Sequence, residues 1–328
     1  LVIDLHTTNG TQHGYHLTYA PALHPNTHPD LDALVRESWL PAITDSIRSD
    51  TGWESYHYGN VPRGDDAETS WRTFDHRPRF NNNYVGLRNR IALLSEAYAY
   101  APFDERIRVT RAFVDAALEL AASQASEIAA LVERIDQTSI AGQRLATRAA
   151  LHRSEEPVSI LMGATEEVAN PYTRAPMRRR LDVAEPTEMP AYISFAASED
   201  ETVPATYYVP AELTNVIDLL AAHGVDGAPL EEDTVIEGEQ FNVTASQTAE
   251  RQFEGHRIRT VEGVWESAEL SLPAGTLVLS TDQPAGRLLF SLLEPRSDDG
   301  LVAWNHLDDA ITLGDRYPVV RRLPSASE

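Results

Sequence analysis

The sequence lacks cysteine and lysine and contains no long apolar run. Without cysteine, the 328-residue chain has no disulfides, no thiolate metal sites and no cysteine nucleophile. No stretch of about 18 consecutive apolar residues occurs, which argues against a membrane span. All 27 basic residues are arginine, a bias that either a salt-adapted surface or a G+C-rich genome produces.

Positive charge is also scarce. The formal net charge is −23, and it is uneven: residues 1–150 carry 19 acidic and 14 basic side chains, while residues 151–328 carry 31 and 13. Because such a surface repels a phosphate backbone, the composition predicts no nucleic-acid partner. The hydrophobic content of 42% is enough to give each of two ordinary domains a buried core.

The patterning predicts an α/β domain at 1–153 and a mainly β domain at 154–328. Strand-like and helix-like patterns alternate in the first part, whereas short β-like runs separated by glycine and proline fill the second. A Ser-Glu-Glu-Pro stretch at 154–157 marks the boundary. The strand spacing favours a sandwich-like second domain, with one helix near 211–222 that ends at Gly224.

Two apolar strands and two helices are predicted in the first part. The strands cover about 1–6 and 91–94, and one helix covers about 30–48. A long amphipathic helix is expected to begin with Asp104 as its N-cap, and further helix is expected up to about residue 150. The stripe that the long helix is expected to bury comprises Ile107, Val114, Leu118, Ala121, Ile128, Leu131 and Ile135.

A polar residue stands at the end of each apolar strand: His6 after the first and Glu96 after the second. In open α/β sheets, ligands bind beyond the carboxyl ends of the strands. If the two strands are parallel neighbours, His6 and Glu96 meet there although they are far apart in the sequence. Two long loops are also expected, at 7–28 and about 50–86, and loops of this length in a compact domain are usually functional.

The residues around both positions resemble those of a known enzyme family. The stretch DLHTTNG at 4–10, followed by HGY at 13–15, is similar to the region of the third zinc ligand in the zinc metallocarboxypeptidases of the carboxypeptidase A type. The stretch RNRIALLSEAY at 88–98 is similar to that family's strand ending in the catalytic glutamate. The segments QP at 283–284 and LLEP at 292–295 resemble long bacterial members with an extra domain.

This resemblance implies both a fold and a chemistry. By this resemblance, the first part is expected to be the C-terminal half of a carboxypeptidase-like α/β/α domain with a mixed sheet. The natural chain is expected to extend upstream of Leu1. His6 becomes a zinc ligand, and Glu96 becomes the general base that activates zinc-bound water and passes the proton to the leaving amine. Asp4 shares a strand face with His6, and either orients the imidazole or is a buried structural aspartate.

The resemblance also implies residues that bind the substrate. A carboxypeptidase must recognise a terminal carboxylate, which the planar guanidinium of arginine suits. Arg88 is predicted to do this, because it lies near Glu96 in sequence and would share its strand face if the strand began at Arg88. Tyr84 is a candidate for the family's substrate-contacting tyrosine, and a surface-loop tyrosine is the alternative.

Part of the family's zinc site is missing from the sequence. A His-x-x-Glu pair should precede His6, and none does. His152 and Glu155 fit the spacing but come late, near the predicted domain boundary. His13 and His16 offer an all-histidine alternative with His6, although their aromatic neighbours favour hydrogen-bonding or pocket roles.

The sequence therefore predicts a zinc-dependent carboxypeptidase that hydrolyses the C-terminal residues of peptides. The chain alone is expected to bind zinc weakly and to have little activity, because a single histidine does not hold zinc tightly. Two alternatives stay open: a zinc-dependent amide or acyl hydrolase that acts on a small molecule, and a noncatalytic binding module. The resemblance implies an extracellular or periplasmic location, and it leaves the oligomeric state open.

Overall fold

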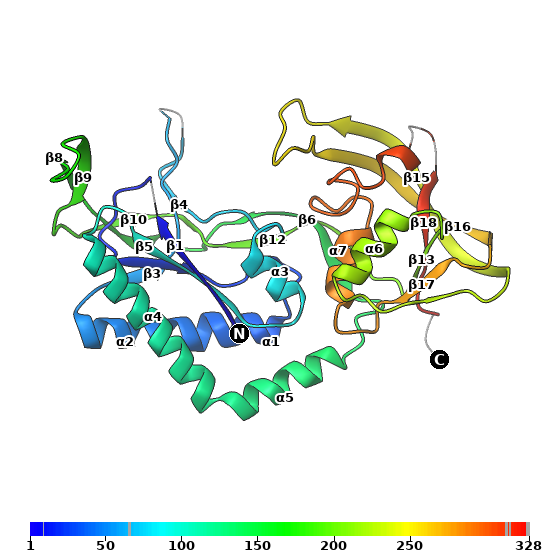
Figure 1. Cartoon of the computed structure of the whole chain (residues 1–328), viewed down its shortest axis with the longest axis horizontal. Coiled ribbons are helices and arrows are strands. Elements are labelled where there is room, and N and C mark those ends of the chain that lie inside the picture. The colour runs from blue at the N-terminus through cyan, green and yellow to red at the C-terminus, as the bar shows by residue number, and fades with distance from the viewer. Residues whose placement is uncertain (9, 65–66, 312–313, 315, 326–328) are drawn as a thin grey trace. The chain divides into compact units, whose positions relative to one another are not determined.

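The computed structural model describes the whole chain except residues 9, 65–66, 312–313, 315 and 326–328. The described residues form two compact units, each of which contains several stretches of the sequence (Figure 1). The first unit comprises 1–86, 90–131 and 150–196, and the second comprises 87–89, 132–149 and 197–328. Among the described helices, none is long and apolar enough to cross a membrane.

A four-stranded mixed sheet forms the centre of the first unit, as predicted. Its strands are β1 (Val2–Thr8), β2 (Leu17–Ala20), β3 (Ser55–His57) and β5 (Ala92–Tyr98). Their order is β1-β5-β2-β3: β1 is parallel to β5, β5 is antiparallel to β2, and β2 is parallel to β3. The apolar run of β5 is buried almost throughout, which fits a strand in the interior of a sheet.

A helical run lies between β2 and β3 in the sequence, where the helix at about 30–48 is predicted. It consists of α1 (Pro29–Ala33), the π-helical segment η1 (Leu34–Trp39) and α2 (Leu40–Thr51). At its start, the side chain of His28 accepts a hydrogen bond from the backbone N–H of Asp30. Gly52 ends it with a φ of 73°, a left-handed conformation that favours glycine.

Helix α4 (Phe103–Ser123) packs against α2 and β5, but not through the predicted stripe. Asp104 lies in its first turn after the cap residue Pro102, where a carboxylate favours the helix dipole, and is not itself the N-cap. Ile107 and Leu118, predicted to be buried, are each 52% exposed. The residues that α4 does bury are Val109, Phe113, Ala116 and Ala117.

The stretch after α5 (Ala125–Asp136) corrects another prediction. Helix is predicted up to about residue 150, but β6 (Arg144–His152) is a strand that pairs with β12 (Ser194–Thr202). Its arginine, leucine and alanine residues have good helix propensity. Strand pairing over this length outweighs that weak local preference.

Residues 150–196 belong to the first unit, so the unit extends past the boundary predicted at 153/154. They form β7 (Val158–Met162), β8 (Thr165–Ala169), β9 (Pro176–Arg180), β10 (Glu185–Met189) and β11 (Ala191–Tyr192). β7 pairs with β10, β8 pairs with β9, and β11 pairs with β4 (Trp71–Arg72). Trp71 is fully buried in a cluster with Ile160 and Met189. Burial of these apolar side chains holds the stretch to the first unit.

The second unit contains a six-stranded antiparallel sheet in the order β14-β17-β13-β18-β15-β16, which confirms the prediction of a mainly β part. Its strands are β13 (Thr206–Val209), β14 (Ala228–Pro229), β15 (Thr234–Thr248), β16 (Arg259–Leu272), β17 (Leu277–Ser280) and β18 (Arg316–Arg322). Its helices include α6 (Thr214–Ala222), α7 (Gly286–Leu293) and the short 3-10 helix η2 (Asp308–Ala310). α6 lies where a helix is predicted near 211–222.

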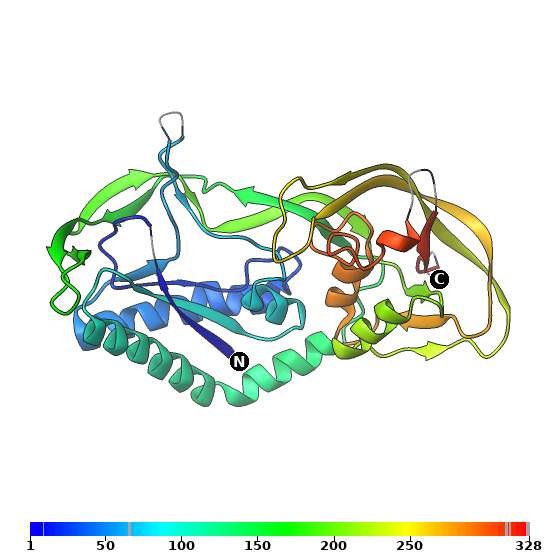
Figure 2. The same ribbon diagram turned by 45° about the horizontal axis from the view of Figure 1, so that its top comes forward.

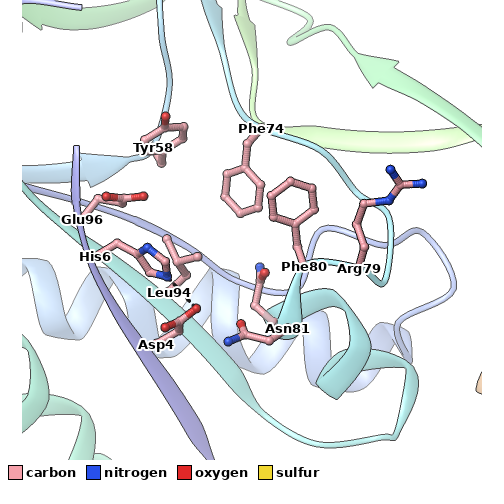
Figure 3. Close-up of a pocket in the computed structure, with 10 residues that line it drawn as sticks. Asp4, His6, Tyr58, Phe74, Arg79, Phe80, Asn81, Leu94 and Glu96 are labelled. Atoms are coloured by element: carbon pink, nitrogen blue, oxygen red, sulfur yellow. Dashed lines mark hydrogen bonds and ion pairs between the residues drawn. The ribbon is translucent and has the colours of Figure 1, made fainter. Parts of the chain in front are cut away.

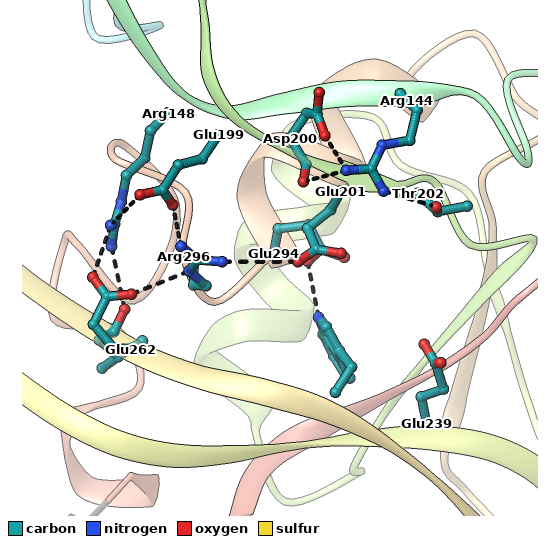
Figure 4. Close-up of polar contacts among 12 residues, drawn as sticks. Arg144, Arg148, Glu199, Asp200, Glu201, Thr202, Glu239, Glu262, Glu294 and Arg296 are labelled. Atoms are coloured by element: carbon teal, nitrogen blue, oxygen red, sulfur yellow. Dashed lines mark hydrogen bonds and ion pairs between the residues drawn. The ribbon is translucent and has the colours of Figure 1, made fainter.

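Charged side chains of the second unit are extensively paired (Figure 4). Arg148 and Arg296 both contact Glu199 and Glu262. All four side chains are partly exposed. Because exposed pairs of this kind contribute little individually, the network mainly fixes the local geometry.

A second group of charges in this unit is buried. The guanidinium of Arg321 lies 3.0 Å from a carboxylate oxygen of Glu294, and the two side chains are only 4% and 1% exposed. The hydroxyl of Tyr207 donates a hydrogen bond of 2.6 Å to the same carboxylate. Burial raises the pKa of Glu294, while Arg321 lowers it. Removal of one partner would leave a buried charge uncompensated.

Candidate active site

The parallel pairing of β1 with β5 brings His6 and Glu96 together. In the register of the two strands, His6 lies directly opposite Glu96. Asp4 lies opposite Leu94, and all four side chains line one pocket. The structure thus confirms that these two sequence-distant residues meet near the carboxyl ends of neighbouring parallel strands.

The pocket at this position has a volume of about 370 Å³ (Figure 3). Glu96, His6 and Asp4 lie on one side of it, and the rings of Phe74 and Phe80 lie on the other. The residues that line it are Asp4, His6, Tyr58, Phe74, Arg79, Phe80, Asn81, Asn82, Leu94 and Glu96. A single amino-acid side chain fits into a space of this size.

Asp4 fixes one side of the His6 imidazole. The distance from Nε2 of His6 to Oδ2 of Asp4 is 2.7 Å, and the two side chains are 48% and 25% exposed. The carboxylate selects the tautomer and ring orientation in which Nε2 is protonated. In that tautomer, the lone pair of Nδ1 is available to a metal or to a hydrogen-bond donor.

Glu96 has an unusual environment for a carboxylate. Its Oε2 atom is buried and has no hydrogen-bond partner among the described residues. Burial raises the pKa of Glu96 to about 7, His6 lowers it, and the negative charge of Asp4 raises it. A carboxyl group with this pKa exchanges protons readily at neutral pH, which suits a general base or acid.

Aromatic side chains form the wall of the pocket across from Glu96. The ring centroids of Phe74 and Phe80 are 5.3 Å apart, and those of Tyr58 and Phe74 are 5.5 Å apart. The hydroxyl of Tyr58 accepts a hydrogen bond of 2.9 Å from Asn60. Burial raises the pKa of Tyr58, with a further contribution from the charge of Glu96. The wall is therefore apolar with a neutral hydroxyl at its edge.

Arg88 and Tyr84 are not among the residues that line this pocket. Tyr84 lies in helix α3 (Asn81–Leu87), and Arg88 follows that helix. The guanidinium of Arg88 donates a hydrogen bond to the backbone carbonyl of His223. The prediction that Arg88 and Glu96 share a strand face is wrong, because β5 begins at Ala92, after Arg88.

The described residues do not complete a zinc site. They contain no group of three or more histidine, cysteine, aspartate or glutamate side chains that could hold a metal. The ring of His13 lies tilted against that of Tyr98 at a centroid distance of 4.2 Å, and the ring of His16 stacks on that of Trp53 at 5.1 Å. Burial lowers the pKa of His13 to about 3 and that of His16 to about 4. The all-histidine alternative is not formed.

The late His-x-x-Glu sequence does not supply the missing ligands either. His152 and Glu155 are both exposed, and neither lines the pocket. At this site the described residues therefore offer one imidazole nitrogen beside a carboxylate. A tetrahedral zinc site requires further ligands in addition.

Six lining residues were not identified individually from the sequence. Tyr58, Phe74, Arg79, Phe80, Asn81 and Asn82 line the pocket. All of them lie in the long segment at about 50–86, whose length alone indicated a functional role. That segment has no periodicity from which the pocket-facing side chains could be selected.

Comparison with known proteins gives a partial similarity. No family model and no solved structure matches the chain. Over 118 residues it is 29% identical to carboxypeptidase 2 of Trichophyton tonsurans, a match that covers 36% of this chain and 22% of the relative. Carboxypeptidase 2 of Trichophyton equinum and of Trichophyton rubrum match over the same length with 29% and 28% identity.

The matched stretch spans only 22% of the length of these curated relatives. The mixed α/β unit followed by a mainly antiparallel β unit is compatible with a carboxypeptidase-like domain and an added β domain. The similarity indicates a distant, carboxypeptidase-like relationship.

Proposed function

We propose that this chain provides the catalytic base and one metal ligand of a zinc-dependent carboxypeptidase. The observation that carries the proposal is the pairing of His6 with Glu96 at neighbouring positions of two parallel strands. Asp4 orients the imidazole of His6, and the raised pKa gives Glu96 the proton affinity that a catalytic base needs. The partial similarity to fungal carboxypeptidases supports the reaction class.

Glu96 has the central role in the proposed reaction. Its carboxylate takes a proton from a water molecule as that water attacks the peptide carbonyl, and then gives the proton to the leaving amine. The pKa of about 7 balances both transfers near neutral pH. Desolvation by burial is the main cause of this pKa.

His6 is the proposed zinc ligand through Nδ1, because Asp4 engages its Nε2. When bound, zinc would polarise the peptide carbonyl and lower the pKa of water. The described residues offer no complete ligand set, so the remaining ligands are expected to come from outside the described residues. Zinc binding by these residues alone is accordingly expected to be weak.

The terminal residue of a peptide is proposed to occupy the pocket. Phe74, Phe80 and Leu94 offer apolar contacts for its side chain. Arg79 also lines the pocket, and a guanidinium is suited to a terminal carboxylate. Arg88 and Tyr84, the sequence-based candidates for this part, lie outside the pocket.

One observation favours a second candidate, a noncatalytic binding module. With no group of three ligands among the described residues, the site could bind a peptide end without hydrolysing it. Peptide binding at equal affinity with and without zinc, and with no turnover, would identify this function.

The proposal is tested with the natural protein expressed from its full reading frame. A blocked peptide and an N-acyl amino acid are offered in parallel, and release of the terminal residue or the acyl group is measured. We expect the peptide to be hydrolysed faster, activity to be lost on chelation, and zinc to restore it. Faster hydrolysis of the N-acyl amino acid would indicate the small-molecule hydrolase. Activity that persists in the presence of a chelator would contradict the proposed dependence on zinc.

A further inference from the structure

The second unit contains a pocket of its own, formed on its six-stranded sheet. All the residues that line this pocket lie between positions 208 and 320, so it belongs to the second unit alone. Its volume is about 420 Å³, which is in the range of sites that hold small organic molecules. It shares no lining residue with the pocket around Glu96.

The strand register shows which face of the sheet carries this pocket. Tyr208 of β13 lies opposite Val320 of β18, and Val320 lies opposite Gln240 of β15. The three side chains therefore share one face of the sheet, and all three line the pocket. On the other face, Tyr317 is fully buried, and its hydroxyl donates a hydrogen bond of 2.8 Å to the carbonyl of Leu293 in α7. The pocket thus lies on the face opposite to α7.

Apolar side chains form the base of the pocket. Tyr208, Leu272 and Val320 line it and are only 4%, 8% and 5% exposed, because they pack in one cluster with Ile236. The hairpin of β15 and β16, drawn in yellow, curves along its length (Figure 2). Leu272, at the end of that hairpin, meets the side chains of β13 and β18 in this cluster. Ligand sites typically combine such an apolar base with a few polar groups.

Three charged side chains and a buried hydroxyl supply the polar groups. Glu212, Glu269 and Arg316 line the pocket and are exposed. The guanidinium of Arg316 donates a hydrogen bond of 2.9 Å to Gln240, whereas neither carboxylate pairs with any described residue. Thr276 also lines the pocket and is 2% exposed, and its hydroxyl oxygen has no hydrogen-bond partner among the described residues. Since buried hydroxyls are normally hydrogen-bonded, this one has hydrogen-bonding capacity left for a ligand.

We propose that this pocket binds a small organic cation, namely a protonated primary amine that carries an apolar group. The apolar group would cover Leu272 and Val320 at the base of the pocket. An ammonium group has three hydrogen-bond donors. The carboxylates of Glu212 and Glu269 and the hydroxyl of Thr276 offer acceptors for them.

Charge favours a cation over an anion in this pocket. Two carboxylates line it against one guanidinium, and that guanidinium is already hydrogen-bonded to Gln240. Residues 197–328, which form most of the second unit, carry 24 acidic and 8 basic side chains. Their summed potential attracts cations and repels anions. Binding of a carboxylate through Arg316 is therefore the outcome that the experiment must distinguish.

The test is isothermal titration calorimetry of the natural protein with two probes that share a phenylethyl group. Phenethylamine carries an ammonium, and 3-phenylpropionate carries a carboxylate. Each probe is titrated into the native protein and into the variants Glu212→Gln, Glu269→Gln and Thr276→Val. Two controls are Glu250→Gln, which changes an exposed glutamate of the same unit outside the pocket, and Glu96→Gln, which changes the pocket of the first unit.

We expect one phenethylamine to bind per chain, about 10-fold more tightly than 3-phenylpropionate. Glu212→Gln, Glu269→Gln and Thr276→Val should each weaken the binding of phenethylamine about 3-fold, and the two controls should leave it unchanged.

Equal or tighter binding of 3-phenylpropionate would overturn the proposal, as would an affinity for phenethylamine that neither glutamine variant of the pocket changes. Absence of saturable binding up to about 10 mM amine would overturn it as well. Loss of binding in Glu96→Gln would assign the amine to the other pocket, with the same consequence. Because no readout depends on hydrolysis, failure here is distinct from failure of the proposed function.

Discussion

At the residue scale, the burial of Glu96 makes the stability of the folded chain depend on pH. Burial raises the pKa of Glu96 from 4.5 to about 7. Between these values the folded chain binds more protons than the unfolded chain, so the contribution of Glu96 to stability is full below pH 4.5 and is lost as the pH rises through about 7.

Glu96→Gln should remove this pH dependence. We expect the variant to gain stability relative to the native chain as the pH rises from about 4.5 to about 7.5. Urea unfolding of both proteins at several pH values measures the difference. The matched control is Glu127→Gln, which changes an exposed glutamate on α5. A difference that is constant with pH, or that matches the control, would contradict the assigned environment.

Asp4→Asn tests whether this carboxylate positions His6. The amide retains the size of the side chain but loses the charge that holds Nε2 at 2.7 Å. Loss of such an outer partner typically lowers metal affinity or activity about 10- to 100-fold. We expect a reduction of this size in the zinc affinity and hydrolytic rate of the natural protein, with unchanged unfolding. Native zinc affinity in the variant would make Asp4 a purely structural residue.

The sequence was sufficient to predict the pairing of His6 with Glu96, but not the remainder of the pocket. A polar residue after each of two apolar strands is a local signal, and parallel pairing converts it into proximity. Phe74 and Phe80 reach the pocket because a long, irregular segment brings them to the pocket that Glu96 also lines. No local pattern encodes such a path. The assignment of Arg88 required the strand to extend back to residue 88, whereas β5 begins at Ala92.

At the element scale, α4 shows why periodicity alone was insufficient. The helix has two apolar stripes, and its pattern predicted burial of Ile107 and Leu118. The stripe with Phe113 packs on the sheet instead, because Tyr19 of β2 offers it a ring to stack on. Choosing between two such stripes requires the tertiary partner, which the helix sequence does not contain.

Substitutions in the two stripes should differ in cost. Phe113 is fully buried and Leu118 is half exposed. We expect Phe113→Ala to lower the free energy of unfolding by about 3–5 kcal/mol and Leu118→Ala to change it by no more than about 0.5 kcal/mol. Denaturant unfolding of the 328-residue chain measures both. Similar losses of unfolding free energy for the two variants would mean that Leu118 is buried within the 328-residue chain.

At the scale of the whole molecule, the large negative net charge affects stability. With 50 acidic and 27 basic side chains, the formal net charge is −23, and the compact state is destabilised by self-repulsion. Salt screens that repulsion, because the Debye length falls from about 10 Å at 0.1 M to about 3 Å at 1 M. We expect the unfolding temperature to rise as sodium chloride increases over this range. A falling temperature would mean that attractive ion pairs, such as those of Arg148 and Arg296, outweigh the repulsion.

The order of the two parts was predictable, whereas their extent was not. Composition and periodicity predicted an α/β part followed by a mainly β part, and the structure confirms that order. The stretch 150–196 reads as short strands, and its membership in the first unit depends on the burial of Trp71 against Ile160 and Met189. Because these partners lie about 90 to 120 positions apart in the sequence, no local pattern predicts the contact.

The most direct test of the proposed site is peptide hydrolysis by the natural protein with Glu96→Gln. Loss of a general base costs about 10²- to 10⁴-fold in rate, so we predict a fall of this size in kcat for release of a C-terminal residue. Glu127→Gln should retain the native rate. Undiminished hydrolysis by the Glu96→Gln protein would contradict the assignment of Glu96 as the catalytic base.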